Sequence, residues 1–291
     1  MVNTSPRIAF WGSSRFSIIV LDEMAREGML PTLIVTAPAK AKGRHLELTP
    51  NKVKVWADAH SIPALEPEKL DSEFLRQLSA VNCQLFIIVA YGRIVSHTII
   101  DMPKHGTLNV HPSLLPKFRG ASPLQSSLLD DVPVGSTYTT GVTIMQIDEE
   151  VDHGPIVSAE RTEIQNWPIR GSKLEETLGT LGGKLLVDTI PKWLSGEIVP
   201  QEQDHAKATY TKKVTKESGH INLDDDAARM YRKVRAYDVW PRTYFTTTRG
   251  GREIRVIVTD AKIENDKLIP IRVIPEAKRE MNYDEFLRGQ K

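Results

Sequence analysis

The chain has 291 residues, which suggests two domains because single hydrophobic cores seldom grow beyond about 250–300 residues. A formal net charge of +1 excludes a chain that is basic throughout, so nucleic-acid binding would require a local basic patch. The single cysteine, Cys83, excludes an intramolecular disulfide and a zinc site built from thiolates, and a small buried thiol is the simplest interpretation.

No apolar run approaches the roughly 20 residues that span a bilayer. The polar residues 1–6 lead directly into a strand-like segment and do not form a signal peptide pattern. We therefore expect a cytoplasmic protein without a membrane partner.

The first 110 residues alternate between apolar runs and amphipathic stretches. The runs predicted as strands are residues 7–11, 33–36, 85–90 and 107–110, and the helical patterns are residues 15–28, 53–60 and 72–79. This order predicts an α/β domain with a mostly parallel sheet. Gly12 follows the first strand, but the further glycines of a dinucleotide-binding fingerprint are missing, so a nicotinamide site is not favoured.

The composition changes after a helical pattern over residues 172–194. Residues 195–208 are polar and read as a linker, which divides the chain into a first domain, 1–194, and a C-terminal domain, 209–291. A helix over 224–237 and strands over 242–248, 253–263 and 267–274 predict a small OB-like β-barrel that carries one helix.

Asn109 and His111 lie at the carboxyl end of the predicted strand 107–110. In open parallel sheets, ligands bind at the carboxyl ends of the strands. Because Asn109 and His111 are two positions apart, their side chains lie on the same side of an extended chain, and Pro112 keeps His111 extended. The pair is therefore a candidate site, although a single histidine is more often structural.

A second candidate lies in residues 141–154, where a predicted strand, 141–147, leads into an acidic loop. Asp148, Glu149 and Glu150 are typical of a solvated turn. Asp152 can fold back towards His111, where a carboxylate would fix the imidazole tautomer and raise its pKa.

These segments carry a specific resemblance. Three segments together resemble the signature of the folate-dependent formyltransferases. They are the run Asn-x-His-x-Ser-Leu-Leu-Pro over residues 109–116, the following residues 117–123, and Asp-x-Gly about 40 residues later. The resemblance implies a Rossmann-like catalytic domain, the formyltransferase fold, with Asn109, His111 and Asp152 as its catalytic residues.

The rest of the chain resembles one branch of this family, the methionyl-tRNA formyltransferases. The matching segments are residues 43–44, 48–50, 53–54, 209–213, 235–237, 240–241 and 286–289. The resemblance covers nearly the whole chain and implies transfer of the formyl group of 10-formyltetrahydrofolate to initiator methionyl-tRNA, in support of translation initiation. We expect a monomer that needs no metal.

The resemblance also implies binding residues. The folate site would be lined by Ser113, Leu114, Leu115 and Pro116, with Phe86, Ala90 and Tyr91 as another wall. The tRNA would meet Lys40, Lys42 and Arg44 in the basic segment 38–50, and Lys212, Lys213, Arg232, Lys233 and Arg235 in the C-terminal domain. Without the resemblance, both basic groups are equally well read as solvated surface.

Three alternatives remain open. A nucleotide-sugar N-formyltransferase could use the same three catalytic residues with the same folate donor. A hydrolase could release formate from the folate by placing water where the amine would attack. An RNA-binding protein could retain an α/β domain that no longer catalyses a reaction.

Overall fold

The structure, a computed structural model, describes residues 6–42 and 47–289 and contains two compact units. The first unit comprises Met1–Arg119, Gly141–Arg161 and Glu176–Thr209, and the second comprises Gly120–Thr140, Thr162–Glu175 and Tyr210–Lys291. The boundary between them falls within the long elements β9 (Ser136–Gln146), β10 (Ile156–Trp167) and α6 (Gly171–Ser195).

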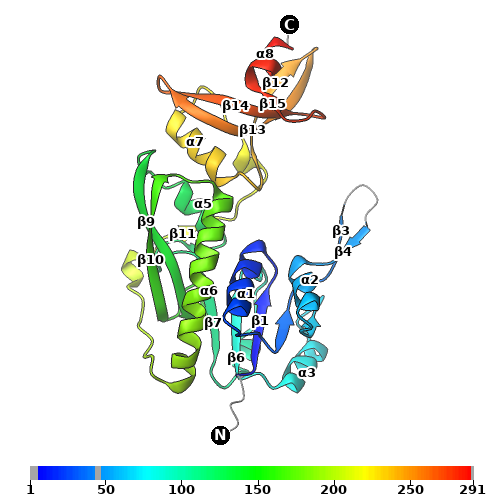
Figure 1. Cartoon of the computed structure of the whole chain (residues 1–291), viewed down its shortest axis with the longest axis vertical. Coiled ribbons are helices and arrows are strands. Elements are labelled where there is room, and N and C mark those ends of the chain that lie inside the picture. The colour runs from blue at the N-terminus through cyan, green and yellow to red at the C-terminus, as the bar shows by residue number, and fades with distance from the viewer. Residues whose placement is uncertain (1–5, 43–46, 290–291) are drawn as a thin grey trace. The chain divides into compact units, whose positions relative to one another are not determined.

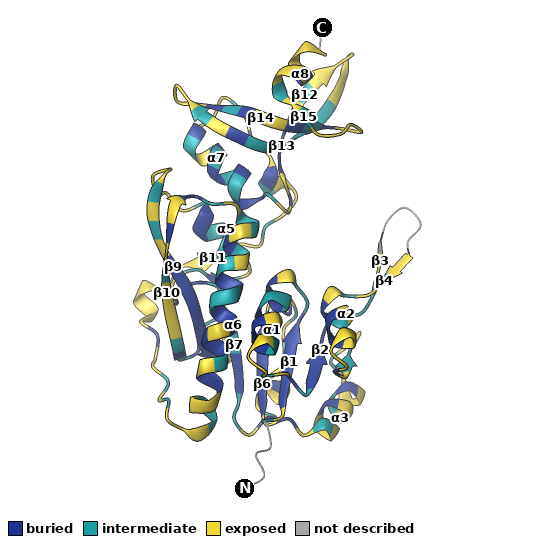
Figure 2. Ribbon diagram, in the orientation of Figure 1, coloured by how far each residue is buried: buried dark blue, intermediate teal, exposed yellow. Residues whose placement is uncertain are grey.

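The first unit contains a seven-stranded sheet in the order β10-β9-β7-β6-β1-β2-β5. Its remaining strands are β1 (Ile8–Gly12), β2 (Leu33–Val35), β5 (Ala64–Leu65), β6 (Leu85–Val89) and β7 (Thr107–His111). The strands from β7 to β5 pair in parallel, whereas β9 runs antiparallel to β7. The predicted α/β class with a mostly parallel sheet is confirmed. All five residues of β1 and of β6 are buried (Figure 2), as expected for strands covered on both faces.

The crossover helices of the first unit begin at side-chain caps that the sequence carries, except the short α4 (His97–Ile100), where Ser96 makes no capping hydrogen bond. The capped helices are α1 (Arg15–Arg26), α2 (Lys52–Ala59) and α3 (Ser72–Val81), labelled in Figure 1. Ser14 accepts a hydrogen bond from the Ser17 amide at 3.2 Å, and Asp71 accepts one from the Phe74 amide at 3.1 Å. Each cap satisfies one of the amides that the first turn of a helix leaves unpaired.

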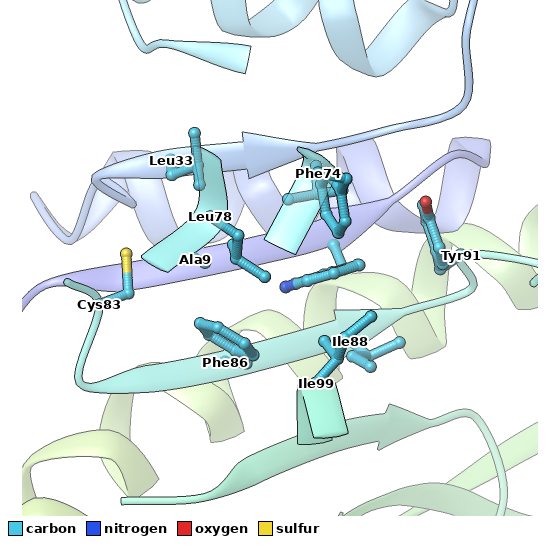
Figure 3. Close-up of a cluster of buried hydrophobic side chains, with 11 residues drawn as sticks. Ala9, Leu33, Phe74, Leu78, Cys83, Phe86, Ile88, Tyr91 and Ile99 are labelled. Atoms are coloured by element: carbon cyan, nitrogen blue, oxygen red, sulfur yellow. The ribbon is translucent and has the colours of Figure 1, made fainter. Parts of the chain in front are cut away.

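One face of the sheet is covered by an apolar cluster centred on Trp11 (Figure 3). Phe74 and Tyr91 meet the Trp11 ring edge-on, with ring centroids 5.6 Å and 5.3 Å away. Cys83 is buried in the same cluster, as predicted. The other buried members of the cluster are Ala9, Leu33, Val35, Leu78, Phe86, Ile88 and Ile99.

Helix α6 approaches the sheet and α1 closely because glycines occupy three of its contact positions, Gly179, Gly182 and Gly183. A Cβ on Gly182 would lie 2.9 Å from Val110 Cγ1, and one on Gly179 or Gly183 would meet α1 side chains. Val110 lies in β7 between Asn109 and His111. The close approach of α6 therefore supports the strand that carries the candidate site.

The second unit is built on an antiparallel sheet in the order β12-β13-β14-β15. Its strands are β12 (Thr243–Arg249), β13 (Arg252–Glu264), β14 (Lys267–Pro275) and β15 (Met281–Asn282), and its helices are α5 (Pro123–Leu128), α7 (Ala227–Ala236) and α8 (Tyr283–Arg288). Asn265 and Asp266 both have positive φ, which suits the tight turn that joins β13 to β14. Among the described residues, the strands pair in an open order, so the expected closed barrel is not found.

Several short elements were not predicted. The basic segment contains a hairpin of β3 (Lys40–Lys42) and β4 (Glu47–Thr49), and two further strands, β8 (Arg119–Gly120) and β11 (Tyr210–Thr211), pair with each other. Two 3₁₀ turns, His205–Lys207 and Glu217–Gly219, complete the elements. The edge strand β10 was also missed, because its half-exposed side chains lack a continuous apolar run. No helix in the described part of the chain is both long and apolar enough to cross a bilayer.

The packing of α6 can be tested with Gly182→Val. Since even a single methyl would meet Val110 at 2.9 Å, we expect a loss of about 1–3 kcal/mol in the free energy of unfolding, measured by urea titration. Lys184→Val, at an exposed position of the same helix, is the control. Equal losses in the two variants would contradict the proposed close contact.

Candidate active site

The site is built at the carboxyl end of β7. This strand lies between β6, parallel, and β9, antiparallel, with Asn109 opposite Met145 and His111 opposite Thr143. Asn109 is half-buried and His111 is 3% exposed. The position at the carboxyl edge of a parallel sheet is the one that the sequence predicts.

The loop after β9 brings Asp152 to both of these side chains. One carboxylate oxygen accepts from Asn109 Nδ2 at 3.5 Å, and the other lies 3.6 Å from His111 Nδ1. Asp152 has a φ of +51°, in the left-handed region. At Gly154 a Cβ would lie 2.0 Å from the Gln146 carbonyl oxygen, so only glycine fits there. The structure thus brings the three predicted residues together.

A backbone carbonyl determines which nitrogen of His111 carries hydrogen. His111 Nε2 lies 3.0 Å from the carbonyl oxygen of Phe118, which can only accept. In the neutral ring, Nε2 is therefore the protonated nitrogen. Nδ1, which faces Asp152, is left as the nitrogen that can take up a proton.

Burial lowers the pKa of His111 below its ordinary value of 6.5. Asp152 and the Phe118 carbonyl act in the opposite direction, but desolvation of the charged ring is the larger effect. The expectation that the carboxylate would raise the pKa overall is therefore corrected. The ring is neutral near pH 7, and Asp152 limits the cost of charging it.

The predicted folate residues after β7 form an internally bonded turn. Ser113 Oγ donates to the Lys117 carbonyl at 2.6 Å, and Thr143 Oγ1 donates to the Ser113 carbonyl at 2.7 Å. Leu115 is 8% exposed, whereas Leu114 and Pro116 are half-buried. This turn therefore presents Leu114 and Pro116 more openly than Ser113.

The other predicted wall is placed differently. Ala90 follows β6 at the same edge of the sheet and is exposed. Phe86 and Tyr91 belong to the Trp11 cluster, where they are 2% and 3% exposed (Figure 3). Their rings contribute to the core beside the site more than to an open surface.

The predicted tRNA contacts of the first unit lie on the hairpin of β3 and β4. Lys40 is exposed. The side chain of Lys42 and the whole of Arg44 lie outside the described residues. In the second unit, Lys212 and Lys213 are exposed.

Three cations of α7 that the resemblance assigns to the tRNA, Arg232, Lys233 and Arg235, are engaged by contacts within their own unit. Arg232 is 7% exposed and pairs with Asp131 at 2.7 Å. Lys233 donates to the His220 carbonyl, and its pKa is lowered by burial. Arg235 donates to the Pro168 carbonyl. Helical spacing places these residues near one another, but contacts within the unit occupy them.

Three residues around the site were not singled out in the sequence. Phe118 contributes a backbone carbonyl, for which no side-chain pattern exists. Arg119 and Gln203 hydrogen-bond to each other in the interior of the first unit, although Gln203 falls in the segment interpreted as a linker. In the part of the chain that is described, no cluster of three or more His, Cys, Asp or Glu side chains could hold a metal ion.

Comparison with known proteins identifies the family. The sequence model of the formyl transferases matches residues 7–190, and that of the formyl transferase C-terminal domain matches residues 213–269. The chain belongs to the formyl transferase family. The three candidate catalytic residues, Asn109, His111 and Asp152, lie within the first of the two matched regions.

Curated relatives match the formyl transferase over most of its length. The methionyl-tRNA formyltransferase of Chloroflexus aurantiacus is 37% identical over 269 residues, which cover 92% of this chain and 84% of the relative. That of Bacillus subtilis is 35% identical over 251 residues, 86% of this chain and 77% of the relative.

Solved structures share the fold. The methionyl-tRNA formyltransferase of Clostridium thermocellum superimposes with a TM-score of 0.59 at 16% identity, covering 95% of this chain and 99% of that one. HypX of Aquifex aeolicus in complex with tetrahydrofolic acid gives a TM-score of 0.66 at 13% identity, covering 98% of this chain. The formyl transferase spans about half of the HypX chain, with 47% covered.

The burial of His111 predicts a pH-dependent stability. Because the unfolded chain binds a proton near pH 6.5 and the folded ring resists it, the folded state loses stability as the pH falls below 6.5. We expect the difference in unfolding free energy between the parent and His111→Asn to shrink from pH 8 to pH 5, measured by urea titration. A difference that stays constant over this range would contradict the burial argument.

Proposed function

We propose that this formyl transferase transfers the formyl group of 10-formyltetrahydrofolate to the α-amino group of initiator methionyl-tRNA. The observation that carries the proposal is the convergence of an amide, a neutral imidazole and a carboxylate at the carboxyl edge of the sheet. The full-length similarity to methionyl-tRNA formyltransferases supports the choice of acceptor.

The reaction places specific demands on these residues. Attack of an amine on the formyl carbon produces a tetrahedral centre that carries an oxyanion, and the amine must lose a proton. Collapse of this centre breaks the bond between the formyl carbon and the folate nitrogen, which takes up a proton and leaves as tetrahydrofolate. A fixed hydrogen-bond donor for such an oxyanion contributes roughly 10²–10³ in rate in comparable sites. A proton acceptor with a pKa near the working pH contributes about 10²–10⁴.

Asn109 suits the role of the donor. Its amide group has two N–H bonds, and the long contact of 3.5 Å to Asp152 constrains the side chain from one side. We assign the second N–H to the oxyanion.

His111 suits the role of the proton acceptor at Nδ1, because the Phe118 carbonyl already holds hydrogen on Nε2. When Nδ1 accepts the proton of the amine, the ring becomes charged. The His111 side chain is only 4% exposed, so water can do little to stabilise that charge. The Asp152 carboxylate, 3.6 Å away, supplies that stabilisation.

The folate donor would meet the turn after β7. The half-buried Leu114 and Pro116 offer apolar contact, and the exposed Ala90 follows the neighbouring strand at the same edge. We assign these residues, with Ser113 and Leu115 beneath them, to the folate site. Phe86 and Tyr91 would support this wall from the core.

For the tRNA we assign the exposed cations Lys40, Lys212 and Lys213, with Lys42 and Arg44 in the same basic segment as Lys40. Arg232, Lys233 and Arg235 are engaged within their own unit, so we give them a supporting role in shaping α7. We further propose that the second unit, expected to be OB-like, is the tRNA-binding domain, and that the enzyme acts as a monomer in the cytoplasm.

The acceptor is tested by offering labelled 10-formyltetrahydrofolate together with methionyl-tRNA, with an amino sugar nucleotide, or alone. We expect label on the aminoacyl-tRNA, since the chain matches that branch throughout. Label on the sugar, or release as free formate with none on the tRNA, would overturn the choice of acceptor.

The role of the carboxylate is tested by Asp152→Asn. We expect kcat for formyl transfer to fall about 10²–10⁴-fold, because the charged imidazole loses its counter-charge. Glu150→Gln removes the same charge from an exposed position two residues away and serves as the control. A kcat in Asp152→Asn that matches that of Glu150→Gln would refute the assignment.

A further inference from the structure

A single short segment, residues 203–209, hydrogen-bonds to both of the loops that carry the catalytic pair. Gln203 contacts the loop that bears Asp152, and Thr209 contacts the backbone that holds His111. By sequence, residues 203–208 are interpreted as a linker, since they are polar and follow a helix, and Thr209 as the start of the C-terminal domain. Its contacts all lie within the first unit.

Gln203 holds the Asp152 loop by its backbone. Its Nε2 donates to the Asp152 carbonyl at 3.0 Å and to the Gly154 carbonyl at 2.7 Å. One amide group therefore bridges the two carbonyls on either side of His153. One of these carbonyls belongs to Asp152, the residue in the left-handed conformation. This double contact restrains the direction in which the Asp152 side chain leaves the loop.

Arg119 fixes the orientation of the Gln203 amide. Its Nε and Nη2 donate to Gln203 Oε1 at 3.1 Å and 2.7 Å. Arginine has no acceptor, so Oε1 must face Arg119 and Nε2 must face the loop. Arg119 is 1% exposed and Gln203 is 5% exposed, so water does not compete for these bonds.

The hydrogen-bond network of Arg119 and Gln203 also includes His205, which contacts His153 in the Asp152 loop. Arg119 Nη2 also donates to His205 Nδ1 at 2.9 Å. The His205 ring stacks on His153 at 4.0 Å between centroids, with only 3° between the ring planes. The loop is thus held through His153 as well as through its carbonyls.

Thr209 holds the other catalytic loop. Its Oγ1 accepts from the Phe118 amide at 2.8 Å, and its carbonyl accepts from the Arg119 amide at 2.8 Å. The Phe118 carbonyl is the group that accepts from His111 Nε2. The position of this carbonyl, and with it the tautomer of His111, depends on where Thr209 holds the peptide.

We infer that residues 203–209 form a positioning strap, in which Gln203 sets Asp152 and Thr209 sets His111 so that carboxylate and imidazole face each other. Neither residue touches the reacting atoms. The inference rests on the proposed catalytic roles of Asp152 and His111. It assigns a function in catalysis to a segment whose composition indicates only a connection.

The first test is Gln203→Glu. The carboxylate keeps an acceptor for Arg119, but it presents oxygen to the carbonyls of Asp152 and Gly154 where the amide donated. We expect the loop to shift and kcat to fall about 10–10²-fold, as a misplacement near 1 Å produces, with the KM for methionyl-tRNA and for the folate donor unchanged within about twofold.

Gln201→Glu is the matched control. Gln201 is exposed, and its hydrogen bonds to Ile156 involve only the backbone, so the substitution makes the same charge change two residues away without altering those bonds. We expect the parent's kcat. A Gln203→Glu variant with the kcat of Gln201→Glu would overturn the inference.

The second test uses the other end of the strap and a residue at an exposed position, so that folding is not at risk. Thr209→Val keeps the shape of the side chain but has no acceptor for the Phe118 amide, whereas Thr209→Ser keeps the hydroxyl. We expect kcat to fall about 3–10-fold in Thr209→Val and to remain near the parent's value in Thr209→Ser. A purely structural role would not follow the hydroxyl in this way.

The outcomes separate the strap from the proposed function. If Asp152→Asn is inactive while both Gln203→Glu and Thr209→Val turn over at the parent's rate, the strap is refuted and the proposed function stands. If Asp152→Asn itself is fully active, the proposed function fails first. Should Gln203→Glu lose cooperative thermal unfolding, the Thr209 pair decides the question, and equal kcat values in Val and Ser would refute the strap.

Discussion

A neutral imidazole faces a carboxylate across 3.6 Å in a place where little water enters, and the chemistry that we propose for the first unit depends on this contact. Burial disfavours the charged ring, whereas the carboxylate favours it, and burial is the larger effect in the resting state. This balance is useful for a proton acceptor. The ring stays unprotonated and ready until a proton arrives, and the carboxylate then lowers the cost of holding it.

The contact between His111 and Asp152 requires that backbone interactions fix the positions of the two loops on which it depends. Asp152 adopts a left-handed conformation in a turn that only glycine can complete at position 154. His111 is oriented by a carbonyl rather than by a side chain. Such constraints depend on groups that every residue possesses, so they are invisible in a pattern of side chains.

The basic residues show how tertiary contacts redistribute charge. The cations of α7 recur at helical spacing, yet Arg232 is buried against Asp131 and Arg235 bonds to a carbonyl of its own unit. Lys212 and Lys213 are exposed on a segment with no helical pattern. In a chain of net charge +1, a phosphate-binding surface depends on which cations remain accessible, and spacing alone does not reveal this.

The sequence by itself determined the order of the main elements, because apolar periodicity, caps and turn residues act locally. The strands containing Ile8, Leu85 and Thr107, and the helices that begin at Arg15 and Ser72, were predicted in this way. The edge strand β10 and the open order of the C-terminal sheet were not, since a half-exposed strand lacks a clear period and strand closure depends on distant pairing.

The sequence also placed Asn109 and His111 at one sheet edge, and the family signature added Asp152. Only the tertiary structure decided that burial lowers the pKa of His111, that Phe118 selects its tautomer, and that Gln203 and Thr209 bond to both catalytic loops. These outcomes depend on desolvation and on hydrogen bonds between residues up to 91 positions apart, which no local pattern can specify.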